Sequence, residues 1–244
     1  WRSPSAVLPT SSTSTIEENI STRTHAHERT SVASCTRPRS QPGASHQSQA
    51  AAAMTASTAR GSVQLIVGPM FSGKSTELLR RMRRHAVAER RLLVVKHSSD
   101  ERYTSEAAVV THNGMEWKGA FACSALAQAN DHAMAADVIG IDEGQFFHDV
   151  AEFSDAMACL GKLVIVAALD ATFERAPFGA IPELLPRAES VTKLSAICKV
   201  CKADASFTAR LSDETAVVMV GGAELYAAMC RTCHMAHVAR KARA

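Results

Sequence analysis

One glycine-rich stretch carries the residue types that bind a phosphate chain: Gly68-Pro69-Met70-Phe71-Ser72-Gly73-Lys74-Ser75. Glycines let backbone N–H groups turn inward as an anion nest, and a helix that begins here would add the positive end of its dipole. Lys74 would reach the β- and γ-phosphates, and the Ser75 hydroxyl would hold Mg²⁺. The pattern predicts a site for a nucleoside triphosphate with magnesium. The alternative is a chance match in a turn.

The segments that flank this stretch favour the phosphate site over a chance match. Residues 63–67 form a short apolar run that is typical of a buried strand. In residues 76–90 the apolar side chains recur on one helical stripe, and arginines occupy the other positions. Strand, loop and helix in this order place the N–H groups of the loop at a helix N-terminus, which is the arrangement that phosphate binding needs.

Two acids follow other buried strands. Asp142 ends the apolar run 138–142, and Asp170 ends the run 163–170. Asp142 is expected to hold Mg²⁺, as an aspartate in this position does in a phosphate-loop enzyme. The next residue, Glu143, is then a candidate base that takes the proton of an acceptor hydroxyl. The alternative for Glu143 is an exposed loop acid without a catalytic role.

The order of the remaining segments indicates a parallel sheet. Residues 92–96 predict another buried strand, and 120–136 and 150–160 predict helices. Near-continuous apolar strands that alternate with helices are typical of a sheet covered on both faces. Ligands bind beyond the carboxyl ends of such strands, where the phosphate loop and both aspartates fall.

Four cysteines occur as two pairs, Cys198 with Cys201 and Cys230 with Cys233. Pairs at this spacing predict a tetrahedral zinc site, and four protein ligands leave no open position, so the zinc would be structural. The alternative is two unrelated pairs of buried thiols. The other cysteines stand alone and need no catalytic role.

Composition limits the partners and the compartment. The 244 residues have a formal net charge of +3, which is too mild to favour nucleic acid as the main partner. No apolar run approaches the roughly 18 residues that span a membrane. Cysteine pairs that bind metal point to a reducing compartment. We therefore expect a cytoplasmic protein without nucleic-acid or membrane partners.

Residues 1–60 differ from the rest, because they are rich in Ser, Thr, Ala and Arg and poor in acids. Such a segment buries too little surface to offset its chain entropy, so we expect it to be disordered. Three interpretations remain: an organelle transit peptide, a plain tail, or translated upstream sequence. The last is suggested by Trp1 at the start and Met54 before the first strand. A transit peptide would place the protein in an organelle.

Several segments together resemble the cytosolic-type, zinc-containing (type II) thymidine kinase family, and the resemblance runs from about Ser62 to about Lys241. They are residues 68–78, 142–147, 166–173, 177–179, 221–226 and the two cysteine pairs. The resemblance implies an α/β fold in which a P-loop parallel sheet is flanked by helices (RecA-like), with a small zinc-ribbon-like lasso domain. The expected domains are 61–193 for the sheet and 194–240 for the lasso.

The resemblance implies transfer of the γ-phosphate of ATP to the 5′-hydroxyl of thymidine, and deoxyuridine as a further substrate. It implies that Asp100, Arg102, Asp142 and Gln145 join the loop around ATP, and that Glu143 is the proton acceptor. Thymine would contact the side chains or the lasso backbone at Phe146, Leu169, Phe173, Thr208, Val217, Val218, Met219, Val220, Gly221 and Tyr226. A homotetramer and feedback inhibition by dTTP are also implied.

One position departs from the family pattern, and two other functions stay open. The family's Thr-His-Asp-Gly is Thr111-His112-Asn113-Gly114 here, which weakens activity only if the acid does more than form a turn. The same phosphate loop could serve an ATP-gated switch. It could also serve a kinase for another nucleoside, such as deoxycytidine.

Overall fold

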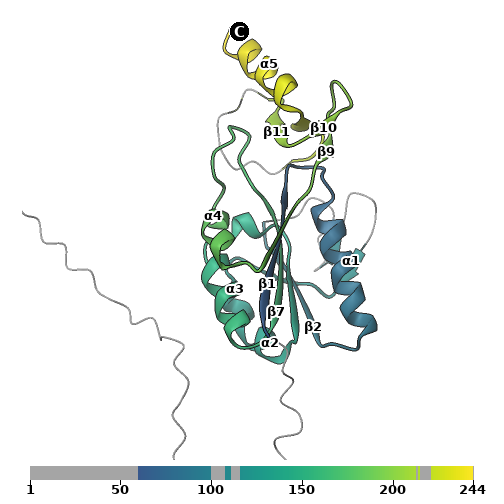
Figure 1. The fold of residues 1–244 in the computed structure, drawn as a ribbon, viewed down its shortest axis with the longest axis vertical. Helices are drawn as coiled ribbons and strands as arrows, with labels where there is room; N and C mark the ends of the chain where they lie inside the picture. The colour runs from purple at the N-terminus through teal and green to yellow at the C-terminus, as the bar shows by residue number, and fades with distance from the viewer. Residues whose placement is uncertain (1–59, 100–107, 111–115, 213, 215–220, 244) are drawn as a thin grey trace, which may run out of the picture. The chain divides into compact units, whose positions relative to one another are not determined.

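The structure is a computed structural model that describes residues 60–99, 108–110, 116–212, 214 and 221–243. These residues fall in one compact unit, Gly43–Ala244. Its centre is a six-stranded parallel sheet in the order β5-β2-β6-β7-β1-β8 (Figure 1). The strands are β1 (Ser62–Gly68), β2 (Leu92–His97), β5 (Phe121–Cys123), β6 (Val138–Ile141), β7 (Leu163–Leu169) and β8 (Ser190–Lys193).

Helices cover both faces of the sheet, as the sequence predicts (Figure 1). One face packs against α1 (Lys74–Val87), and the other against α2 (Asn130–Ala135), α3 (Val150–Cys159), α4 (Ile181–Leu184) and the short 3-10 helix Leu126–Ala129. The alternation of side chains in β1 explains the two layers. Val63, Leu65 and Val67 belong to the core under α3, whereas Ile66 belongs to the core under α1.

The prediction of one helix over 120–136 is wrong. The segment opens with β5, which pairs with the edge of β2 (Val95 with Phe121), and only then turns into two short helices. Alanine content favours a helix, but the open edge of β2 offers the backbone of residues 121–123 a row of hydrogen-bonding partners. β8 was not predicted either; it is short, its side chains are mostly exposed, and it pairs with β1.

Beyond Leu194 the chain leaves the parallel sheet. It forms two antiparallel pairs, β9 (Ala196–Ile197) with β10 (Asp204–Ala205) and β11 (Phe207–Arg210) with β12 (Tyr226–Met229). Helix α5 (Arg231–Lys241) follows. We call residues 195–243 the C-terminal lobe. It has an apolar cluster of its own, made of alanines, Met229 and cysteines. The domain boundary at 193/194 stays a prediction.

A further antiparallel pair, β3 (Ala108–Val110) with β4 (Glu116–Lys118), lies outside the main sheet. Among the residues that the structure describes, no helix is both long enough and apolar enough to cross a membrane.

Candidate nucleotide-binding site and cysteine cluster

The phosphate loop leaves β1 in a backbone conformation that its sequence allows. Gly68 and Gly73 have φ angles of 151° and 81°, and Phe71 between them has a φ of 66°. A Cβ on Gly68 would lie 2.5 Å from the carbonyl oxygen of Leu194, so no other residue fits there without a shift of backbone. Left-handed residues between right-handed ones turn successive N–H groups towards one point, which makes an anion nest.

The basic side chain of the loop folds over it. Lys74 Nζ donates a hydrogen bond to the carbonyl oxygen of Pro69 at 2.8 Å, and Ser72 Oγ donates to the same oxygen at 2.8 Å. Lys74 is buried. Its ammonium group is therefore held at the loop, where it can exchange the carbonyl for phosphate oxygens.

The predicted magnesium ligands lie together. Ser75 Oγ donates to Oδ1 of Asp142 at 2.9 Å, although 67 positions separate them. Ser75 lies in the first turn of α1, and Asp142 follows β6 directly, with its N–H bonded to the carbonyl of Val95 in β2. Asp142 is 4% exposed. A hydroxyl and a carboxylate at a shared edge of the sheet suit Mg²⁺, which prefers oxygen ligands.

Glu143 has a left-handed backbone, with a φ of 53°. Its carboxylate is fixed by a neighbour: Nε2 of Gln145 donates to Oε2 of Glu143 at 2.5 Å. Oε1 of Gln145 accepts the N–H of Leu169, at the end of β7, at 2.9 Å. Gln145 is 4% exposed, so its amide is a buried bridge between the acid and the sheet. Glu143 is thus placed beside Asp142 and tied to β7.

The two phenylalanines after Gln145 have different surroundings. Phe147 is fully buried in the core under α3. Phe146 is half-buried, and its ring lies 5.7 Å from the ring of His97 and 5.8 Å from that of Phe178. Core packing therefore explains Phe147, whereas Phe146 stands with other rings beyond the strand ends. Leu169 is half-buried at the end of β7.

Further along, Arg210 brings two of the predicted thymine-contacting residues together. Its guanidinium lies 4.1 Å from the ring centroid of Phe173 and 5.2 Å from that of Tyr226. It also donates to the Tyr226 hydroxyl at 2.7 Å. A cavity of about 730 Å³ borders Phe173 and Arg210 and extends to His234 of α5. Thr208, two residues before Arg210, is buried.

Other predicted residues are not described by the structure. Asp100, Arg102 and the lasso residues 217–220 lie outside the described residues, as does the turn at 111–114. Gly221 is described and half-buried. Asp170, at the strand-end edge, forms an ion pair of 2.7 Å with Lys193 of β8.

The four predicted zinc ligands form one cluster. Their Sγ atoms all lie within 4.8 Å of one another, and those of Cys201 and Cys230 are 3.5 Å apart. Zinc–sulfur bonds of about 2.3 Å would place tetrahedral sulfurs about 3.8 Å apart, so the donor set fits zinc.

The four thiols perturb one another's pKa values because they lie so close together. Backbone N–H groups, first that of Cys201, lower the pKa of Cys198 to about 6 despite its burial. The hydrogen bond with Cys230 and burial raise the pKa of Cys233 to about 12. Four adjacent thiols cannot all ionise without a positive charge between them, and a bound zinc ion would supply it.

A parallel sheet with a phosphate loop, an adjacent serine–aspartate pair and a bridged glutamate defines a phosphate-loop α/β nucleotide-binding protein. The family model for thymidine kinase matches residues 61–234. The chain therefore belongs to the thymidine kinase family.

Individual relatives agree with the family match. The chain is 51% identical to the cytosolic thymidine kinase of Homo sapiens over 178 residues, which cover 73% of this chain and 75% of that protein. It is 51% identical over 174 residues to the thymidine kinase of Yaba monkey tumor virus, covering 71% and 94%. It is 45% identical over 177 residues to thymidine kinase 1 of Dictyostelium discoideum, covering 71% and 78%.

Sequence reasoning missed two residues of the site, His97 and Arg210, and one role of Gln145. His97 ends β2, and its ring is tilted against that of Phe146. Arg210 bridges Phe173 and Tyr226. Gln145, predicted as a phosphate contact, also holds the carboxylate of Glu143. Only Arg210 could have been found from the sequence. It lies two positions after Thr208, a predicted base contact, and alternate residues of a strand point to the same face.

Proposed function

We propose that the protein transfers the γ-phosphate of ATP to the 5′-hydroxyl of thymidine, giving thymidine monophosphate. Membership of the thymidine kinase family supports the substrates. The contact that carries the proposal is the 2.9 Å hydrogen bond between Ser75 and Asp142, with Glu143 next in sequence. This contact supports the proposal because the two side chains whose oxygens suit magnesium lie together at the carboxyl ends of the strands, with a candidate base next to Asp142.

The phosphate loop binds and orients the triphosphate. Its N–H groups face the phosphate oxygens, and Lys74 leaves the Pro69 carbonyl for the β- and γ-phosphates. Ser75 and Asp142 hold magnesium, which when bound neutralises charge on the phosphates. Asp100, Arg102 and Gln145 complete the surroundings of ATP in this proposal.

Glu143 accepts the proton of the 5′-hydroxyl while that oxygen attacks the γ-phosphorus, and ADP leaves as the bond from the γ-phosphorus to the β–γ bridging oxygen breaks. The buried amide of Gln145 holds the carboxylate in one orientation. The proposed base follows Asp142 in the sequence and has a left-handed backbone, with a φ of 53°. A Cβ at Gly144 would lie 2.6 Å from a methyl of Val166, so this stretch is packed closely against β7.

Thymine packs between the ring of Phe146, Leu169, Phe173 and Thr208 in this proposal, and the lasso residues 217–221 with Tyr226 read its edge. The stack of Arg210 on Phe173 and Tyr226 supports a pocket here, because it fixes both rings. A structural zinc held by Cys198, Cys201, Cys230 and Cys233 pins the ends of the segment that carries the lasso.

The proposal extends to assembly and location: a cytoplasmic homotetramer that dTTP inhibits. Gel filtration with light scattering tests the tetramer, and inhibition of turnover by dTTP tests the feedback.

The activity itself is tested with the full chain, Mg-ATP and a panel of thymidine, deoxyuridine and deoxycytidine, with products identified by mass spectrometry. Thymidine should give the 5′-monophosphate at the highest rate, followed by deoxyuridine. ATP hydrolysis that no nucleoside accelerates would instead indicate an ATP-gated switch. A preference for deoxycytidine would show that the acceptor is deoxycytidine rather than thymidine.

A further inference from the structure

One hydrogen bond joins the phosphate loop to the C-terminal lobe. The backbone N–H of Met70 donates to Oγ1 of Thr208 at 3.0 Å, across 138 positions of sequence. Thr208 is 6% exposed, so water competes poorly for its hydroxyl. Replacement of this acceptor by a methyl group would leave the Met70 N–H with a desolvation cost that the native contact offsets.

The strand pair that carries Thr208 also reaches the cysteine cluster. Thr208 in β11 is the register partner of Ala228 in β12. The carbonyl of Ala228 accepts the N–H of Lys199 at 2.9 Å, and Lys199 follows Cys198 directly. The next residues of β12 lead to Cys230. The strand pair thus connects both halves of the cysteine cluster with the residue that holds the loop.

A shared cavity also borders the same two parts. Phe71, which follows Met70, lines a cavity of about 220 Å³ together with Cys198, Lys199 and Ala228. Phe71 has the left-handed φ of 66° that turns the loop. The hydrogen bond and the cavity therefore both involve the first half of the loop, before the phosphate-binding Lys74 and Ser75.

We propose that Thr208 is a positioning residue that couples the metal cluster to the phosphate loop. The proposal rests on the proposed function and deepens it, because it gives Thr208 a task besides its contact with thymine. Thr208 holds the Met70 N–H away from the anion and fixes the turn at Phe71. The N–H groups that follow then face the phosphates. Loss of the Thr208 acceptor, or of the metal that orders β11 and β12, loosens the loop and weakens nucleotide binding.

The first test measures binding of a non-hydrolysable ATP analogue with Mg²⁺ to the full chain by calorimetry, without nucleoside. Thr208→Val removes the acceptor and should weaken binding roughly three- to tenfold, the effect of one lost hydrogen bond. Thr208→Ser keeps the hydroxyl and should bind within about twofold of wild type. Thr192→Val is the matched control, because Thr192 is half-buried and its Oγ1 accepts a hydrogen bond from Arg81 of α1 rather than from the phosphate loop.

Wild-type affinity in Thr208→Val would overturn the proposal. So would equal weakening in Thr208→Ser, because this variant keeps the hydroxyl and the loss could then not be assigned to the missing acceptor.

The second test uses hydrogen–deuterium exchange of the peptide that covers residues 68–75. In wild type, a zinc chelator should speed exchange in this peptide several-fold. In Thr208→Val exchange should already be fast, and the chelator should add little. No effect of the chelator on wild type, or the same acceleration in both proteins, would overturn the coupling. Neither readout needs phosphate transfer, so a failure of the coupling is distinguishable from a failure of the proposed kinase activity.

Discussion

The side-chain amide of Gln145 lies 2.5 Å from the carboxylate of Glu143 and bridges it to the backbone N–H of Leu169. A glutamine in this place donates to the acid on one side and accepts from the sheet on the other, so its two ends are not interchangeable. The bridge is buried and thus fixes the orientation of the acid that we propose as the base.

Gln145→Glu keeps the acceptor for Leu169 but sets a second carboxylate against Glu143. Because two adjacent carboxylates resist joint ionisation, the acid limb of the kcat profile should move to higher pH, and kcat at pH 7 should fall about tenfold or more. Steady-state rates from pH 5.5 to 9 measure this. Gln128→Glu serves as the control, since Gln128 is exposed and bonds only locally to Ser124. An unchanged profile would remove Gln145 from its positioning role.

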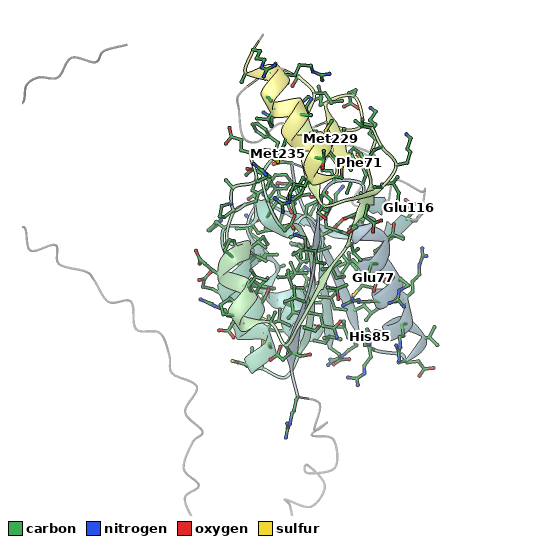
Figure 2. All side chains as sticks on the ribbon, turned by 45° about the horizontal axis from the view of Figure 1, so that its top comes forward. Phe71, Glu77, His85, Glu116, Met229 and Met235 are labelled. Carbon is green, nitrogen blue, oxygen red and sulfur yellow. The ribbon has the colours of Figure 1, made fainter. Side chains whose placement is uncertain are left out.

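Glu77, labelled on α1 in Figure 2, contributes to stability in a pH-dependent way. Its hydrogen bond with Arg80, together with Arg81, lowers its pKa to about 2 against burial. A lowered folded-state pKa gives stability that is present above about pH 4.5 and is lost as the pH falls towards 2.

Glu77→Gln should therefore lower the free energy of unfolding by about 1 kcal/mol at pH 7, a value that allows for solvent screening of the pair, and by much less at pH 3. Urea unfolding at both pH values measures the difference. Glu183→Gln, at an exposed position in the first turn of α4, should change little at either pH. A loss for Glu77→Gln that is equal at both pH values would contradict the ion-pair explanation.

The cysteine cluster predicts one metal ion per chain. Cys198→Ser removes a buried ligand, so zinc content measured by mass spectrometry should fall from one ion per chain towards none, and the thermal midpoint should drop. Cys159→Ser changes an exposed cysteine outside the cluster and should keep full metal content. Zinc retained at one ion per chain in Cys198→Ser would refute the assigned ligand set.

Sequence patterns predict the parts of the site that are local in the chain. Strand, loop and helix around Lys74 follow from apolar periodicity and glycine spacing, and Asp142 follows from its place after a buried strand. The edge strand β5 was missed because its pairing with β2, not the alanine content of the segment, decides its conformation. Contacts such as Met70 with Thr208 depend on how distant segments pack, which no local pattern records.

Single-turnover kinetics of Glu143→Gln tests the central claim, that this carboxylate accepts the proton of the thymidine 5′-hydroxyl. With Mg-ATP and saturating thymidine, the rate of thymidine monophosphate formation should fall by about 10²- to 10⁴-fold relative to wild type, while the affinity for Mg-ATP stays within about threefold. A variant that forms the product at the wild-type rate would contradict the account.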